Sequence, residues 1–478
     1  MEYKKFHPYT IFNFMGKFTF LLIIPIFQQI IFRPVTLKET LISLWKDILL
    51  VIIIFIWSFI EYRSIKYGFH CRKIVLKKGV LIKEKMIIPI ENISSINVVR
   101  KLFPSFLGSY KVFLNVPSNN KKKLISLNIS RSDLEELKKI IVKDNKYNIL
   151  YKADKKKIIL LSIFWSNPVA NFILVAPIVY RFSKILGEEF SQRIYSTVDF
   201  RINLMAIGLP PLIASFAYIL LAAFIIAFFI QFFRYSKFES EVNEESLVIK
   251  RGIITKDEKI ISKRNIINLS VKQTLLMKFF KLYNVYIYTK TSNNAKEHGI
   301  LMLMSADYND VINFVKKSDM PIKFFNKPGI KPVNGTIKNF LLLPLLLFIG
   351  ALCLNFRFST ELWYSQTIFM FFRLLMLFFL WWILFRVQAH KNSGVAFYNG
   401  VLNICGFKKM TLFSEYIKVS NISSLKINQN VFQKMSNRCH IEIEIISDRK
   451  VKYDCRHLNL KDVENFVEIV KKYKIKAI

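Results

Sequence analysis

Cysteine and histidine residues near the end of this 478-residue chain are the side chains whose types could bind a metal. Cys439 is followed directly by His440, and Cys455 lies two residues before His457. Thiolate and imidazole groups suit zinc. The spacing is not a recurring zinc knuckle, however, and the five cysteines are odd in number and include no C-x-x-C pair. We therefore predict no metal, no cofactor and no disulfide.

Motifs that carry catalysis are missing from the sequence. It contains no G-x-x-x-x-G-K-(S/T) loop to hold phosphates, no H-E-x-x-H pair to hold a catalytic metal and no G-x-S-x-G nucleophile turn. The sequence therefore favours a binding or transport protein over an enzyme, and we predict no catalytic residues.

A threefold internal repeat dominates the organisation of the chain. Segments of 25 residues that begin at Asn92, Asn265 and Asn421 align without a gap. Apolar residues alternate along them at strand spacing, as at Ile93, Ile266 and Ile422 in the second column and Val112, Val285 and Ile441 further on. Such residues are expected to form the core, so that truncating Ile266 or Val285 would cost roughly 1 to 5 kcal/mol and unfold a domain.

Paired apolar blocks precede each copy of the repeat. They cover residues 18–32 and 41–60, 158–180 and 202–233, and 340–354 and 368–385. A bilayer core requires a helix of about 20 apolar residues. The blocks are also compatible with buried core helices, but their pairing favours three transmembrane hairpins with six spans. No small-residue cleavage site follows the first block, so a cleaved signal peptide is not predicted.

Basic residues suggest an orientation. Between Glu61 and Lys157 the sequence has 23 Lys plus Arg against 8 Asp plus Glu, and such segments stay on the cytoplasmic side. We therefore expect a multi-pass protein of the cell membrane with both termini and all repeat domains in the cytoplasm. The net charge of +38 would attract anionic lipid headgroups, although part of it fits a general enrichment in Lys. No nucleic-acid-binding motif is present, so nucleic acid is not an expected partner.

Each copy has the pattern of a small strand-rich domain. Extended runs surround the turn residues Gly79, Gly252 and Gly400, where positive φ is expected. The distance from the glycine to the aligned Asn is 13, 13 and 21 residues, which predicts an eight-residue insertion in the third copy. Each copy closes with an amphipathic pattern, at residues 132–143, 307–317 and 461–472, and Ser132 with Glu135 is a possible capping box. The pattern predicts an open barrel or sandwich plugged by a C-terminal helix.

Two apolar blocks precede a basic strand domain, (Lys/Arg)-Gly-(Val/Ile) turns occur at Lys78 and Arg251, and the strands have the pattern I-x-x-(I/L)-x-(V/I). In these features the chain resembles the bacterial pleckstrin-homology-like membrane proteins of the YdbS and YdbT type. Three copies resemble the longer YdbT-type members. The third copy departs from the pattern, since Asn399 replaces the basic turn residue and residues 437–440 break the aligned segment. The predicted fold is a membrane α plus β protein, with hairpins over 1–62, 151–234 and 326–387 and PH-like domains over 63–150, 235–325 and 388–478.

The resemblance implies membrane-anchored domains that bind anionic lipid or protein partners, assemble with a related subunit or as a homo-oligomer, and have no established catalytic role. Binding candidates are two basic clusters, Lys121, Lys122, Lys123 and Lys155, Lys156, Lys157. The first also fits an exposed loop tip, and the second a topology anchor. We predict a docking scaffold or accessory subunit. The alternative is a transporter or lipid-translocating core that uses the polar residues Asn167, Asn171 and Arg373, which pairing between spans explains equally well.

Overall fold

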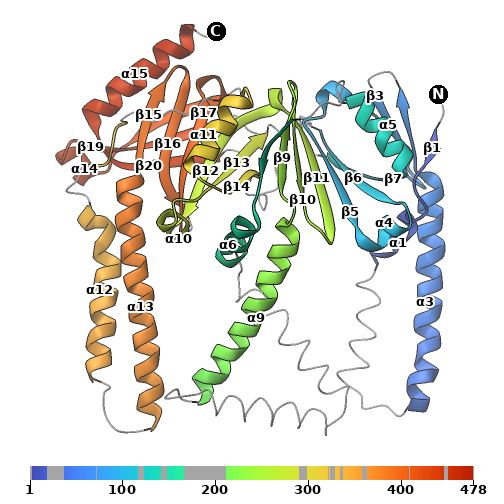
Figure 1. The fold of residues 1–478 in the computed structure, drawn as a ribbon, viewed down its shortest axis with the longest axis horizontal. Helices are drawn as coiled ribbons and strands as arrows, with labels where there is room; N and C mark the ends of the chain where they lie inside the picture. Colours follow the sequence, from blue (N-terminus) through green and yellow to red (C-terminus); the bar gives the residue numbers. More distant parts are fainter. Residues whose placement is uncertain are drawn as a thin grey trace. The chain divides into compact units, whose positions relative to one another are not determined.

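The computed structural model, whose helices and strands are labelled in Figure 1, divides the chain into two compact units. One comprises Met1–Ile149, Ser240–Asn265 and Thr289–Asn293, and the other Leu150–Glu239, Ile266–Tyr288 and Asn294–Ile478. The second repeat is shared between them, and each unit is described by itself. The structure describes residues 3–18, 37–70, 73–116, 123–141, 148–165, 211–289, 299–320, 322, 329–333, 337–357, 363–408, 410–445 and 451–476.

The three repeats have one order of elements: three strands and a single 3₁₀ turn, a strand, a five-residue helix, two strands and a closing helix. In the first repeat these are β2 (Lys66–His70), β3 (Lys73–Lys78), β4 (Glu84–Pro89), η1 (Ile90–Asn92), β5 (Ser95–Lys101), α4 (Leu102–Phe106), β6 (Tyr110–Val116), β7 (Lys123–Ile129) and α5 (Arg131–Ile141). The predicted repetition of domains is therefore confirmed.

The second repeat comprises β9 (Glu239–Val242), β10 (Ser246–Arg251), β11 (Thr255–Ser262), η2 (Lys263–Asn265), β12 (Ile266–Thr274), α10 (Leu275–Phe279), β13 (Tyr283–Thr289), β14 (Ile300–Ala306) and α11 (Tyr308–Lys317). The third comprises β15 (Gly394–Tyr398), β16 (Val401–Lys408), β17 (Thr411–Lys418), η4 (Val419–Asn421), β18 (Ile422–Asn428), α14 (Val431–Met435), β19 (Arg438–Ile445), β20 (Val451–Asn459) and α15 (Leu460–Lys476). Despite its departures in sequence, the third repeat contains every element of the other two.

Successive repeats are joined through continuous antiparallel sheets. One sheet has the order β7-β6-β5-β11-β10-β9-β8, where β8 is Asn148–Lys152, and another has the order β14-β13-β12-β17-β16-β15. The first repeat's β5 thus pairs with β11, and the second repeat's β12 pairs with β17. We call these the first seam and the second seam. Their registers are equivalent, because Ile261 lies opposite Ser95 in the first and Ile417 lies opposite Asn268 in the second.

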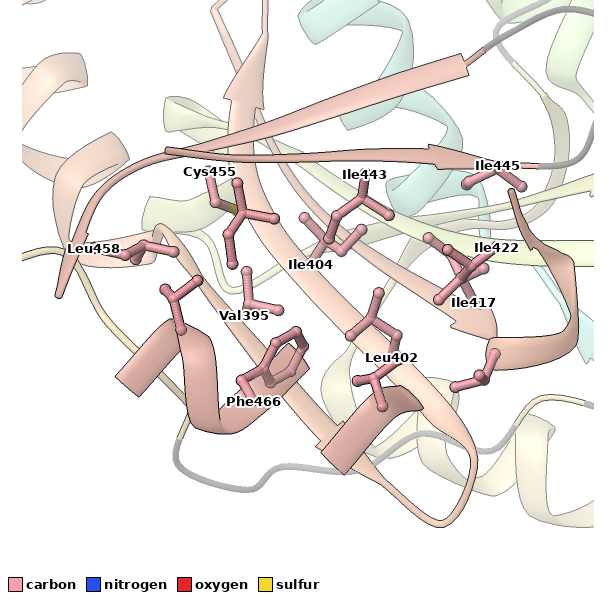
Figure 2. Close-up of a cluster of buried hydrophobic side chains, with 14 of the residues drawn as sticks. Val395, Leu402, Ile404, Ile417, Ile422, Ile443, Ile445, Cys455, Leu458 and Phe466 are labelled. Atoms are coloured by element: carbon pink, nitrogen blue, oxygen red, sulfur yellow. The ribbon is translucent and has the colours of Figure 1, made fainter. Parts of the chain in front are cut away.

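The core of the third repeat lies between strands β15–β17, strands β18–β20 and the closing helix α15. Val395, Leu402, Ile404 and Ile417 of β15–β17 face Ile443 and other apolar residues of β18–β20 (Figure 2). Val463, Phe466 and Val470 of α15 close this core at helical spacing. A similar core in the first unit combines Ile74 of β3, Val112 of β6 and Leu134 of α5, and β1 (Lys4–Lys5) extends its four-stranded sheet β1-β2-β3-β4.

The apolar columns of the repeat are core for the most part. Ile93, Ile266 and Ile422 are at most 6% exposed, and Val112, Val285 and Ile441 at most 1%. In the seventh column Val98 is fully buried but Ile427 is 38% exposed. The difference has a physical reason, since β18 ends its sheet, with β19 as its neighbour, whereas β5 lies between two strands.

The predicted transmembrane architecture is wrong. The helices outside the repeats are α1 (Thr10–Met15), α3 (Leu37–Ser64), α6 (Lys155–Trp165), α9 (Pro211–Tyr235), α12 (Ile337–Arg357) and α13 (Trp363–Asn392). Among the described residues, no helix is both long enough and apolar enough to cross a membrane. For example, α6 has 11 residues against the ~20 required. This finding overturns the three hairpins, the fold class built on them and the multi-pass location.

Two local predictions also need correction. Gly400 lies between β15 and β16, whereas Gly79 and Gly252 lie one hairpin later, between β3 and β4 and between β10 and β11. All three have positive φ, as expected, but they are not equivalent, and the apparent insertion in the third copy disappears. Helix α5 is capped by Ser130, whose Oγ accepts from the Asp133 N–H at 3.3 Å, so the proposed box at Ser132 does not form the N-cap.

Candidate functional site

The short helices α4, α10 and α14 expose apolar side chains at aligned positions of the three repeats. Phe106, Phe279 and Met435 occupy one column and are 85%, 82% and 83% exposed. Three columns earlier, Phe103, Leu276 and Phe432 are 67%, 43% and 81% exposed. We call these five-residue helices the apolar tips. Single exposed apolar residues are ordinary, but the same exposure at aligned positions of three repeats makes each tip a candidate contact site.

Local hydrogen bonds hold each apolar tip in shape. Gly108, Lys281 and Asn437, which share one column of the repeat, all have positive φ just after the helix. In the first tip the Gly108 N–H donates to Ser105 O at 3.0 Å and the Ser109 N–H to Pro104 O at 2.8 Å. These two hydrogen bonds together form a Schellman C-cap. The N–H groups of Lys281 and Leu282 make the same pair of hydrogen bonds in the second tip. The exposure therefore belongs to an ordered turn.

The N-terminal ends of the second and third tips are also capped. Thr274 Oγ1 accepts from the Met277 N–H at 3.2 Å, and Asn430 forms a reciprocal capping box with Gln433. Met277 and Gln433 share one column and point inward, with exposures of 1% and 5%. Each of these helices thus fixes one side chain inside the domain while its neighbours project outward.

The sequence around the apolar tips is basic. The aligned windows 97–111, 270–284 and 426–440 each contain three Lys or Arg and no Asp or Glu. Lys101, Lys281 and Lys434 are exposed beside the three tips. Exposed apolar side chains with a neighbouring exposed lysine match the requirements of an anionic lipid surface.

Sequence reasoning missed the apolar tips because their residues were included in an aligned segment read as core. Two signals mark them. The alternation of apolar residues at strand spacing breaks at Leu102, Leu275 and Val431, where the helices begin, and acidic residues are missing from all three windows.

A groove of about 730 Å³ lies within the second unit between α11 and the second seam. Its polar lining includes Tyr283, Tyr308, Tyr416, Lys278 and Lys316. Burial raises the pKa of Tyr283, while burial and the nearby Lys391 charge lower the pKa of Lys278. Because the lining also includes Asp319, the groove carries groups of both charges and suits binding of a polar ligand.

A polar network lies on the other face of the second seam. Glu415 is 2% exposed, and its carboxylate accepts from Asn268 Nδ2 at 2.9 Å and from Ser270 Oγ at 2.6 Å. Burial raises the pKa of Glu415 to about 7, against the opposing effects of the Lys272 charge and these hydrogen bonds. Lys272 Nζ donates to Tyr288 Oη at 2.6 Å, and burial lowers the Lys272 pKa. Enclosed in this way, the network links repeats and offers no accessible acid for catalysis.

The histidines of the third repeat form a half-buried pair. The His440 and His457 rings are 4.9 Å apart, and the His457 N–H donates to His440 Nδ1 at 3.0 Å. Burial, then the neighbouring His440 and arginines, lower the pKa of His457 to about 4. Cys439 and Cys455 are buried. Within the described residues, no three His, Cys, Asp or Glu side chains are brought together as metal ligands.

The predicted basic residues lie in different environments. Lys121 and Lys122 fall outside the described residues, and Lys123 begins β7. Lys155 and Lys156 are exposed at the start of α6. Lys157 instead pairs with Asp310 at 2.6 Å and Asp307 at 3.2 Å, which links α6 to α11. The structure thus separates the second cluster into two exposed lysines and one that holds two helices together.

Of the predicted intramembrane residues, Asn167 and Asn171 lie outside the described part of the chain. Arg373 lies within α13, and its side chain is likewise outside the description. Their roles stay predictions.

Comparison with known proteins places these features in a family. The family model of the bacterial PH domain matches residues 21–144 and again residues 190–318, which together make up more than half of the chain. None of the curated proteins compared with the chain matches it. The matches fall on the first two repeats, and the third repeats their order of elements. The chain therefore belongs to the bacterial PH domain family.

Proposed function

We propose that this chain is a non-catalytic scaffold that attaches to anionic lipid surfaces and presents PH domains to protein partners. Membership of a family whose domains bind lipids and proteins supports this function. The main supporting observation is that an ordered apolar tip with a capped C-terminal end occurs in each of the three repeats. The exposed apolar residues of each tip lie in a sequence window that contains basic residues and no acidic ones. On this proposal the tips insert into the headgroup region while the lysines contact lipid phosphates.

Lipid is favoured over protein as the occupant of the tips because of charge. Each basic residue near an anionic leaflet contributes about 1 kcal/mol, and Lys101, Lys281 and Lys434 are exposed beside the three tips. The predicted cluster Lys121, Lys122, Lys123 and the exposed Lys155 and Lys156 would add to this attraction. As part of the same proposal, the chain has the predicted domain boundaries and is similar to the YdbT-type proteins. Its protein partner is then a related subunit or a further copy of the chain.

Sedimentation of the full chain with vesicles tests the function. We expect the protein to pellet with vesicles of equal parts phosphatidylglycerol and phosphatidylcholine, and to stay in solution with phosphatidylcholine alone. High salt of about 1 M shortens the Debye length to ~3 Å and should weaken, without abolishing, the binding. The proposal would be refuted if the wild-type chain stayed in solution with the anionic vesicles.

The apolar tips are tested by the combined variant Phe106→Ser, Phe279→Ser, Met435→Ser. Removing apolar side chains that become buried in the headgroup region should weaken vesicle binding by about tenfold or more, since ~1.4 kcal/mol corresponds to tenfold. The matched control is Ile149→Ser with Ile469→Ser, because these residues are also exposed, at 57% and 53%, but lie outside the tips. Equal binding of both variants would show that the tips do not insert.

The first basic cluster is tested separately. Lys121→Glu, Lys122→Glu and Lys123→Glu together should weaken sedimentation with the anionic vesicles, most strongly at low salt. The control reverses Lys461 and Lys471 of α15, which are exposed on a helix outside the tips. Unchanged sedimentation of the triple variant would remove lipid contact at this cluster.

A further inference from the structure

We propose that β4 of one copy of this chain pairs with β18 of a second copy, so that the joining of repeats continues from molecule to molecule. Within the chain, β5 of the first repeat accepts β11 of the second, and β12 of the second accepts β17 of the third. In both seams the fourth strand of one repeat pairs with the third strand of the next repeat. By the same rule β18, a fourth strand, should pair with the third strand of a following repeat, and β4, a third strand, should pair with the fourth strand of a preceding one. In the described residues each is the last strand of its sheet.

The seams predict the register of this pairing. Each incoming strand ends just before a 3₁₀ turn, at Pro89 in β4, Ser262 in β11 and Lys418 in β17, which makes Ile88 equivalent to Ile261 and Ile417. On the accepting side, Ser424 is equivalent to Ser95 and Asn268 in the aligned segments. Transferring the observed pairs, Ser95 with Ile261 and Asn268 with Ile417, puts Ile88 opposite Ser424. The next pairs are then Ile87 with Leu425, Met86 with Lys426 and Lys85 with Ile427.

Burial at equivalent positions favours this pairing. Ile260 and Tyr416, the equivalents of Ile87 in the seams, are 5% and 9% exposed, whereas Ile87 is 53% exposed. On the accepting side, Val98 is fully buried but its equivalent Ile427 is 38% exposed. Pairing in the proposed register would cover both isoleucines, and it sets no like charges directly opposite each other.

A second copy is the occupant to which the geometry points, because one chain carries both complementary edges. Strand addition of this kind gains main-chain hydrogen bonds and uses alternate side chains for specificity. The contact is heterologous, since β4 and β18 are different surfaces, so it generates rings or open chains instead of a closed symmetric pair. The full chain should therefore form a series of species larger than a dimer as concentration rises.

Cross-linking between two singly substituted copies tests the register. One copy carries Met86→Cys and the other Lys426→Cys, both with the exposed Cys353 changed to Ser. Any disulfide between the new cysteines must join two molecules, and we expect it on mild oxidation of the mixture. The control mixes Lys85→Cys with Lys426→Cys, which the register places on opposite faces of the sheet. Equal yield from both mixtures, or no yield from the first, would overturn the proposal.

Disruption of the edge provides an independent measurement. Ile87→Asp should raise the dissociation constant for self-association by at least about tenfold in analytical ultracentrifugation, because the seam would bury the added charge. Ile469→Asp on α15 is the control, since Ile469 is also 53% exposed. Circular dichroism checks that both variants fold. A wild-type chain that stays monomeric at all concentrations, or association that Ile87→Asp leaves unchanged, would contradict head-to-tail pairing.

Two further outcomes separate the possible occupants. If a chain carrying both Met86→Cys and Lys426→Cys forms the disulfide within one molecule while the mixture of single variants does not, the two edges pair in cis and the proposal fails. Association that survives Ile87→Asp but disappears in the apolar tip variant would assign self-association to the tips. Neither result depends on vesicle binding, so the failure of this inference is distinct from failure of the proposed function.

Discussion

The two seams have one backbone register but different polar centres. At equivalent positions, Lys259 lies opposite Asn97 in the first seam and Glu415 lies opposite Ser270 in the second. The carboxylates of the first seam are ion-paired, Asp257 with Arg251 and Glu258 with Lys138, both at 2.6 Å. Glu415 in the second seam instead accepts from the neutral groups of Asn268 and Ser270.

This difference shows which residues fix the register and which do not. Ile261 and Ile417 are equivalent and both are fully buried, although the polar residues beside them differ in charge and environment. Because a one-residue slip would move every apolar side chain to the wrong face of the sheet, the buried isoleucines determine the pairing. The polar residues determine how each seam responds to pH and salt.

Loss of the buried isoleucines should have the largest effect. Ile261→Ala and Ile417→Ala should each cost roughly 2 to 5 kcal/mol, from lost burial and the cavity left behind. Hydrogen exchange measured by mass spectrometry separates the seams: the first variant should lose amide protection in β5 and β11, and the second in β12 and β17. Ile253→Ala is the control, because Ile253 is 42% exposed. Loss of protection in both seams from either variant would contradict their independence.

The second seam should weaken as the pH rises. The pKa of Glu415 is about 7 in the folded chain against an ordinary 4.5, so between these values the folded state holds a proton that the unfolded state has released. The free energy of unfolding of this seam should therefore fall between about pH 4.5 and pH 7, by roughly 1 to 3 kcal/mol, and level off above.

Glu415→Gln should remove this slope, since the amide is neutral at every pH. Hydrogen exchange of β12 and β17 at a series of pH values, corrected for the intrinsic exchange rate, provides the measurement. At pH 8 the variant should be at least as stable as the wild type, because it avoids a buried charge. A wild-type slope that persists in the variant would assign the pH response to another group.

The third repeat should lose stability in acid through a different group. The pKa of His457 falls to about 4 in the folded chain from an ordinary 6.5, so the unfolded state takes up a proton first as the pH drops. Stability should decline between about pH 6.5 and pH 4, by about 1 kcal/mol for a half-buried ring. The variant His457→Asn should remove this loss of stability between pH 6.5 and pH 4, because Asn does not titrate. Asn also tolerates the positive φ of 61° at this position. If the His457→Asn variant is as sensitive to acid as the wild type, His440 or a carboxyl group is responsible.

How far the sequence predicts this structure depends on whether a feature is local. The strand pattern of the aligned segments, the closing helices and the positive φ of the turn glycines follow from local spacing, and the sequence predicts each of them. The seams do not follow from local spacing, because alternation in β5 or β12 shows that a strand has a buried face without showing which strand pairs at its edge. The continuous sheets were therefore missed.

The errors also have physical causes. Apolar residues in the tips were taken as core, because composition alone does not distinguish a buried side chain from one that projects from a capped turn, as Met277 and Phe279 do from one helix. Long apolar blocks were taken as spans, which the described helices do not support. Of the candidate site residues, Lys157 was predicted to bind lipid or a partner or to anchor the topology, and its two carboxylate partners, Asp307 and Asp310, are distant in sequence.

The smallest expected effect concerns the ion pairs of the first seam. Lys138 Nζ of α5 lies 2.6 and 2.7 Å from the carboxylate oxygens of Glu258 on β11, so the pair links the closing helix of one repeat to a strand of the next. Glu258→Gln should cost only about 0.5 to 1 kcal/mol, because the partners are partly exposed to water and salt screens them. Hydrogen exchange of β5 and β11 should show the loss at low salt and little of it at ~1 M salt. The same salt change should leave the Glu415 seam almost unaffected, since its hydrogen bonds are enclosed. Equal salt sensitivity of the two seams would mean that the second is open to solvent and that its polar centre resembles the first.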